Sequence, residues 1–193
     1  MRHRWMGLAA AGVLLVAART AAAGEASPAG AALSPKAEDA LRLVASSDDY
    51  QRQTGFLRLE ALRDSATVPA IRPYLSSKDP DIRAESLRAM AAIQAAEAVP
   101  LLLETLQRDR DARVRRAAIL GIEPFAASDS AITPALLAAL TDRDTTVRMT
   151  AVDVVSRLKD PRAREAILAR NKREHRHDVR RVLKLAMKRL GAE

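Results

Sequence analysis

The chain has 193 residues and no cysteine, so it cannot form disulfide bonds, a thiolate nucleophile or a cysteine-ligated metal site. Hydrophobic residues make up 48% and charged residues 29%, enough to bury a core, and the 3% of aromatic residues favours packed helices over a sheet. The formal charge of +8 is uneven: residues 1–23 carry +3, residues 24–158 carry −2 and residues 159–193 carry +7. This distribution excludes a uniformly basic nucleic-acid binder, and we expect no nucleic-acid partner.

The first residues have the layout of a secretory signal peptide. Residues 1–6 are short and basic, residues 7–18 are apolar and uncharged, and small residues follow up to Ala23. The apolar stretch is shorter than the about 20 residues that span a membrane. We therefore expect a signal peptide over residues 1–23, cleaved near Ala23, and a periplasmic or secreted protein; an uncleaved anchor and a buried helix are the alternatives. Gly, Ser, Pro and Ala predict a flexible leader over residues 24–33.

The rest of the chain repeats one pattern with a spacing of 31 to 33 residues. The copies are registered on one arginine each: Arg52, Arg83, Arg115, Arg148 and Arg180. Four residues earlier stands a residue that can cap a helix, except in the last copy: Asp48, Asp79, Asp111, Asp144 and Arg176. Apolar residues one before and three, four, seven and ten after the arginine make a stripe at helical spacing. Each copy therefore predicts a helix that begins just before its arginine.

A second patterned segment precedes each of these helices, and proline recurs near its start, where a missing N–H is tolerated: Pro35, Pro69, Pro100, Pro134 and Pro161. Each unit is therefore a helix, a turn and a second helix, and it buries its apolar stripe only by stacking on its neighbours. We count five units in a repeat domain over residues 34–191: 34–64, 65–96, 97–128, 129–158 and 159–191. Pro124 falls inside one expected second helix and predicts that it ends early or kinks there.

The stretch AVPLLLETLQRDRDARVRRAAILGI, residues 98–122, resembles a HEAT repeat, and more narrowly the short HEAT-like repeats first recognised in phycobilisome lyases. The shared signature is a proline-started helix, an Asp-rich turn and a Val-Arg or Ile-Arg pair. The resemblance implies an all-α fold, a right-handed α-α superhelix (HEAT/armadillo-like solenoid) of about five two-helix repeats. It also implies a ladder of side chains between repeats: Arg83, Arg115, Arg148, Arg180, Asp109 and Asp142. Ser46, Ser77 and Glu174 depart from the turn aspartate, so we expect a partial ladder.

In HEAT-like solenoids the second helices line the concave side, which is the usual partner site, and the resemblance implies the same here. The exposed positions lie one, two, five and nine residues after the register arginine. The candidate partner-binding residues are Glu85, Arg88, Arg116, Leu120, Asp153, Arg157, Arg181, Leu185 and Arg189. For each of them, an ordinary solvated helix face is the alternative.

Residues that could carry chemistry are few. Outside residues 1–23 the histidines are His175 and His177, and an i, i+2 spacing on a helix does not converge on a metal. The chain has no Gly-rich phosphate loop and no serine nucleophile motif. It also lacks the His-Glu dipeptides of HEAT-like iron hydroxylases and any recognisable chromophore pocket of the bilin lyases. We expect no catalytic residue, no metal and no cofactor.

These patterns predict a monomeric, non-catalytic protein-interaction module or scaffold of the cell envelope, which binds another protein on its concave face. The alternative is peripheral binding to an anionic surface, a membrane or an acidic partner, through the basic repeat 159–191. A terminal cap that faces water is the simplest interpretation of that repeat. A lyase-like or metal-dependent enzyme is the hypothesis that the sequence supports least.

Overall fold

The computed structural model describes residues 32–93, 98–158 and 160–191, and the expected signal peptide and nearly all of the leader lie outside them. Over the described residues the chain forms α-helices and short 3-10 helices and no strand, as predicted. In chain order the α-helices are α1 (Pro35–Val44), α2 (Asp49–Leu62), α3 (Val68–Ile71), α4 (Pro80–Ile93), α5 (Ala98–Arg108), α6 (Ala112–Ile122), α7 (Ile132–Ala139), α8 (Thr145–Arg157), α9 (Pro161–Arg173) and α10 (His177–Arg189). The 3-10 helices are η1 (Ser65–Thr67), η2 (Arg72–Ser76) and η3 (Glu123–Phe125).

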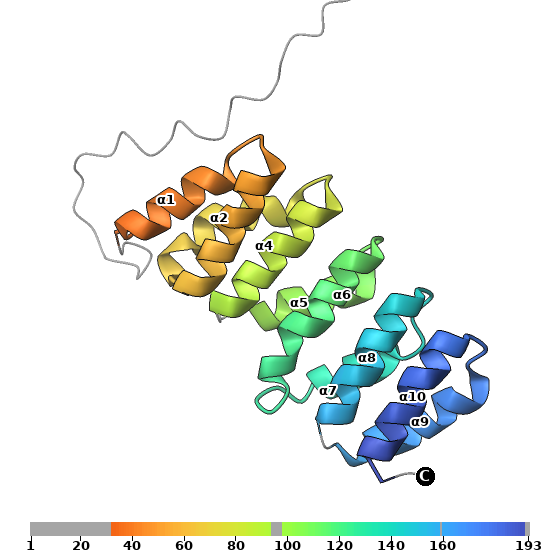
Figure 1. Ribbon diagram of the computed structural model, residues 1–193. Helices are drawn as coiled ribbons and strands as arrows, with labels where there is room; N and C mark the ends of the chain where they lie inside the picture. The colour runs from red at the N-terminus through yellow and green to blue at the C-terminus, as the bar shows by residue number, and fades with distance from the viewer. Residues whose placement is uncertain (1–31, 94–97, 159, 192–193) are drawn as a thin grey trace, which may run out of the picture. The chain divides into compact units, whose positions relative to one another are not determined.

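The helices stack in two layers (Figure 1). In one layer α2, α4, α6, α8 and α10 follow one another, each packed against the next. Each of them also packs on its own first helix: α1 on α2, α3 on α4, α5 on α6, α7 on α8 and α9 on α10. The described residues therefore form an α-α solenoid, and the predicted fold class is confirmed. None of the described helices is both long and apolar enough to cross a membrane.

Side-chain caps begin most of the longer helices, and those at Asp48, Asp79, Asp111 and Asp144 lie where the sequence predicts them. In each case a side-chain oxygen accepts a hydrogen bond from a backbone N–H of the first turn: Ser34 for α1, Asp48 for α2, Asp111 for α6, Asp144 for α8 and Asp160 for α9. Asp79 accepts from the N–H of Asp81 at 2.8 Å in the same way at the start of α4. These bonds satisfy donors that a helix start leaves free, and they begin α2, α4, α6 and α8 at the same register, whereas α10 has no side-chain cap.

The first helix of the second helix pair, in the unit 65–96, differs from its prediction. In place of one continuous helix the chain forms η1, the four-residue α3 and η2. Pro73 has no N–H to donate to the carbonyl of Pro69, and its ring conflicts with a regular helix at that point. Pro124 has the predicted effect, because α6 ends at Ile122 and the chain continues as the 3-10 helix η3.

The core lies between the two layers and follows the predicted stripe. The residues four after the register arginine are at most 1% exposed in the first four pairs: Phe56, Leu87, Ile119 and Val152. The residue three after the register arginine is mostly small, and the space for its side chain is most limited at Gly55. A Cβ there would lie 2.6 Å from the Val44 nitrogen and 2.8 Å from the Ala40 oxygen. Glycine is therefore required for α1 and α2 to approach this closely.

Candidate functional site

A buried arginine joins each of three neighbouring junctions between helix pairs. Arg83 donates from Nε and Nη2 to the two carboxylate oxygens of Asp109, both at 2.9 Å. Its Nη1 donates to the carbonyl of Ser77 at 2.8 Å. The two side chains are only 10% and 14% exposed. Because the guanidinium is planar and its donors match a carboxylate, this bidentate pair fixes the following turn against α4.

The same arrangement recurs at the next two junctions. Arg115 donates to the Asp142 carboxylate at 2.8 and 2.7 Å, and Arg148 donates to Glu174 at 3.0 and 3.4 Å. Burial raises the pKa of Asp142, but hydrogen bonds from Arg115 and a backbone N–H outweigh it, so the pKa lies below its usual value. These interactions hold the carboxylates ionised inside the solenoid.

Glu174 takes the place of the turn aspartate and forms the ion pair, although a departure from the ladder is expected at this position. Its side chain is 2% exposed and is shared by Arg148 and Arg170. Burial raises the pKa of Glu174, but hydrogen bonds from Arg170, the Arg176 N–H and Arg148 outweigh it and lower the pKa to about 2. The extra methylene of glutamate therefore does not prevent this junction from forming its ion pair.

The remaining two register arginines are not joined to a following turn. Arg52 pairs with Asp49 on its own helix, and its buried Nε has no hydrogen-bond partner among the described residues. Ser77 stands where the turn carboxylate would be, and its Oγ accepts from the Asp79 N–H at 3.2 Å. Arg180 was predicted to belong to the ladder, but it is exposed and makes no ion pair within the described ranges. No described turn follows α10 to supply it with a carboxylate.

The candidate partner-binding residues on α4 and α6 lie together. One hollow of about 290 Å³ is lined by four of them: Glu85, Arg88, Arg116 and Leu120. A second hollow of about 280 Å³ is lined by residues from the end of α2, from α4 and α6, and from η3: Glu60, Arg63, Arg88, Ala91, Ala92, Leu120, Gly121 and Pro124. Arg88 and Leu120 line both hollows, so the two hollows adjoin. Leu120 is 42% exposed at their common wall.

The charges in these hollows are incompletely paired. Arg88 Nε lies 3.6 Å from Glu60 Oε1, and this oxygen is buried without a hydrogen bond from any described residue. Burial raises the pKa of Glu60 and outweighs the opposing effect of Arg88, and burial likewise raises the pKa of Glu85. Arg116 is exposed and forms no ion pair in the described part of the chain. The surface therefore offers an apolar side chain beside a free guanidinium.

Three other candidates are engaged with one another. Arg157 donates to both oxygens of Glu123 at 2.7 and 2.8 Å and also pairs with Asp153. Arg189 donates to Asp153 at 3.2 Å and to Ser156 Oγ at 2.6 Å. This network links η3, α8 and α10, so these side chains stabilise the stack of second helices. Glu123 was not among the candidates. It lies eight residues after Arg115, and Arg157 lies nine residues after Arg148, so the two have nearly the same position in neighbouring repeats.

The last two candidates, Arg181 and Leu185, are exposed on α10 and line neither hollow. His175 and His177 are exposed at the start of α10. Within the described ranges, no group of three or more His, Asp or Glu side chains is placed to hold a metal ion.

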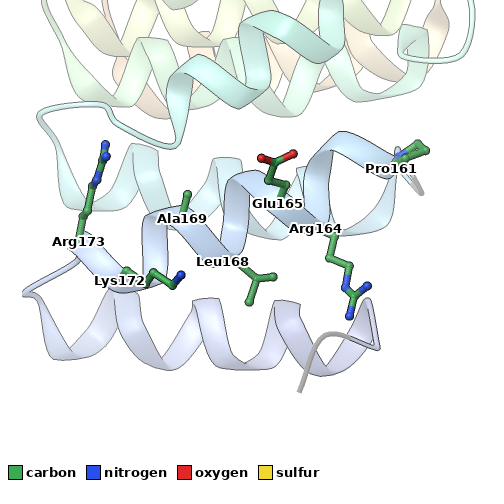
Figure 2. Close-up of a pocket in the computed structure, with 7 residues that line it drawn as sticks. All are labelled: Pro161, Arg164, Glu165, Leu168, Ala169, Lys172 and Arg173. Carbon is green, nitrogen blue, oxygen red and sulfur yellow. The ribbon is translucent and has the colours of Figure 1, made fainter.

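A larger hollow of about 600 Å³, which was not predicted from the sequence, runs along α9 (Figure 2). Its lining combines three cations, one acid and three apolar residues: Pro161, Arg164, Glu165, Leu168, Ala169, Lys172 and Arg173. All of them come from a single helix, so the hollow is a surface of α9 and not a crevice between repeats.

Comparison with known proteins agrees with this architecture. The sequence model of the family described as HEAT repeats matches residues 37–123 and 102–188. The crystal structure of an engineered protein from the Northeast Structural Genomics Consortium is similar, with a TM-score of 0.51 and 18% sequence identity over 81% of this chain and 79% of that chain. That likeness concerns the fold alone. No curated protein sequence gives a significant match. Since the repeat model matches most of its residues, the chain belongs to the HEAT-repeat family.

Proposed function

We propose that this chain is a non-catalytic interaction module of the cell envelope, which binds a partner protein on the layer of second helices. Repeat solenoids present extended surfaces that serve as binding sites. The observation that carries the proposal is the pair of adjoining hollows on α4 and α6, where exposed Leu120 lies beside Arg116, which has no ion-pair partner among the described residues.

The chemistry of these hollows favours recognition of an apolar side chain next to a carboxylate. Leu120 can be covered by an apolar group, and Arg116 can bind a carboxylate without first losing an internal partner. Arg88 is only loosely held at 3.6 Å from Glu60, so a partner carboxylate can compete for it. Arg157, in contrast, is held by Glu123 and Asp153, and we assign it to the stack and not to the partner.

A pull-down tests this function. Residues 24–193 are incubated with envelope extract, and retained proteins are identified by mass spectrometry. We expect one enriched partner, which is lost when Arg88 and Arg116 are both changed to Glu. The matched control changes Arg58 and Arg110, exposed cations outside both hollows, to Glu and should retain the partner. Retention by the Arg88/Arg116 variant, or no partner for a chain that keeps its helical circular dichroism, contradicts the proposal.

The envelope location is supported by the basic, apolar and small-residue order of residues 1–23. Cell fractionation followed by N-terminal sequencing should find the protein outside the cytoplasm and beginning close to Gly24. We also propose that the repeats are of the short type first recognised in phycobilisome lyases, on the strength of their 31–33-residue spacing and Val-Arg pairs. This similarity concerns repeat type, and we propose no lyase activity from it.

A second candidate function is peripheral binding to an anionic surface. It is favoured by the cations of α10, of which Arg180, Arg181, Lys184 and Lys188 are exposed and form no ion pair among the described residues. Their attraction to an anionic surface would weaken as salt screens it.

A further inference from the structure

Three cations stand one helical turn apart on α10: Arg180, Lys184 and Lys188. All three are exposed. In the four earlier pairs the residue equivalent to Lys184 is apolar and at most 1% exposed. The cations therefore occupy the side of α10 that, in earlier pairs, is buried between repeats. We call this row, together with Arg164 and Lys172 of α9, the basic edge.

The basic edge extends across the last helix pair. Arg164 Nη2 donates to the Gly191 carbonyl at 3.4 Å, which places this part of α9 beside the end of α10. Figure 2 shows Arg164 and Leu168 directed toward α10, whereas Glu165 is directed the other way. Lys172 lies two turns after Arg164 on the same helix and is exposed. Both helices of the last pair therefore carry exposed cations, and half-buried Leu168 lies between Arg164 and Lys172 in the sequence of α9.

Solvation alone does not account for a row of one sign. Like charges one turn apart on a helix repel each other and destabilise it. A surface that only needed water could alternate acids and bases at these positions. The uniform row is therefore better explained by an anionic ligand that neutralises it.

The ladder indicates which anion fits. Arg180 stands at the register of Arg83, Arg115 and Arg148, each of which binds a carboxylate from the turn of the following pair. Its guanidinium has no carboxylate partner in the part of the chain that the structure describes, and it can form the same bidentate contact with an added one. We propose that the basic edge binds an acidic helical segment of a partner protein, which packs on α10 with one carboxylate on Arg180 and others on Lys184 and Lys188.

This proposal rests on the second candidate function and narrows it from any anionic surface to a protein segment. A membrane fits less well, because a helix that lies in a bilayer surface needs an apolar face to insert. The apolar face of α10 is used in the core: Val179, Leu183 and Ala186 are at most 3% exposed. Of the large apolar residues of α10, Leu185 alone is mostly exposed.

The test uses residues 24–193 and two helical peptides of about 20 residues, rich in Ala, with either Glu or Gln at i, i+4 and i+8. Binding is measured by fluorescence anisotropy at low and at physiological salt. We expect the Glu peptide to bind at least about tenfold more tightly than the Gln peptide, with affinity falling as salt rises. Changing Arg180, Lys184 and Lys188 to Glu should abolish binding. The same charge change at Arg58, Lys78 and Arg110, exposed elsewhere, should leave binding within about twofold.

Two further measurements separate the alternatives. Arg180→Lys keeps the charge but loses the bidentate contact, and should weaken binding by about five- to tenfold, whereas Lys184→Arg should not. Co-sedimentation with phosphatidylserine vesicles tests the lipid. Binding to vesicles but not to the Glu peptide overturns the acidic segment and leaves the second candidate function intact; binding to neither overturns both. Equal weakening by the two triple variants overturns the basic edge as a site.

Discussion

The junction between the first two helix pairs is stabilised differently from the three that follow. At the first, Phe56 is fully buried and meets Tyr74 edge to face with ring centroids 5.7 Å apart, and no carboxylate among the described residues of the next pair binds Arg52. At the later junctions the equivalent core residues are aliphatic, and a buried arginine binds a carboxylate. The comparison teaches that one repeat architecture can be joined by an aromatic contact or by an ion pair.

The largest effect should come from breaking a later junction. Asp142→Ala leaves the guanidinium of Arg115, whose side chain is 5% exposed, buried without its carboxylate. We expect the free energy of unfolding to fall by about 3–5 kcal/mol, measured by urea denaturation. Asp81→Ala is the control, because its pair with Arg113 is more than half exposed and should cost less than about 1 kcal/mol. Similar losses for both variants would contradict the importance of burial.

Acid should weaken the later junctions selectively. The pKa of Glu174 is lowered to about 2 in the folded chain from an ordinary value near 4.5, so its stabilising effect is complete above about pH 4.5. That effect is lost as the pH falls from 4.5 toward 2, and it amounts to about 3–4 kcal/mol at about 1.4 kcal/mol per pKa unit. Hydrogen exchange at low pH should show α8–α10 opening before α1 and α2. Opening of α1 and α2 first would contradict this order.

A smaller effect should follow from giving the first junction the missing carboxylate. Ser77 has the same position in its repeat as Asp109, which binds Arg83. Ser77→Asp therefore places a carboxylate where Arg52 can bind it, and we expect the free energy of unfolding to rise by about 1 kcal/mol. Thermal unfolding measures the gain. Ser46→Asp is the matched control, because Ser46 has the same register but no described arginine from a preceding pair. If both variants gain equally, the effect comes from helix capping and not from the junction.

The sequence predicts the parts of this structure that depend on local spacing. The capping residues and the buried stripe follow from positions within one repeat, and the resemblance to HEAT repeats implies the pairs of Arg83 and Arg115 with aspartates of the following repeat. Two features do not. Glu174 acts as the third carboxylate because its length still lets it reach Arg148, which a comparison of residue types does not show. Pro73 breaks a helix that its apolar pattern alone would continue.

The candidate site is predicted only in part for a related reason. Periodicity finds which side chains of the second helices are exposed, including Arg116 and Leu120. It does not show which charges meet across helices, because that depends on how far neighbouring helices are displaced along each other. Arg157 and Glu123 come from different copies and pair across that displacement. The free and the engaged arginines therefore become distinguishable only in the folded chain.

The ladder bonds also have a consequence for how the chain folds. Each joins residues only 26 or 27 positions apart, so the contact that fixes one pair is complete as soon as the next pair has formed. Contacts of such short sequence separation favour rapid folding, and stability in such arrays is the sum of each pair and its nearest neighbours. Folding can therefore begin at an interior pair and spread in both directions. The outermost pairs, each with one neighbour among the described repeats, should be the first to unravel.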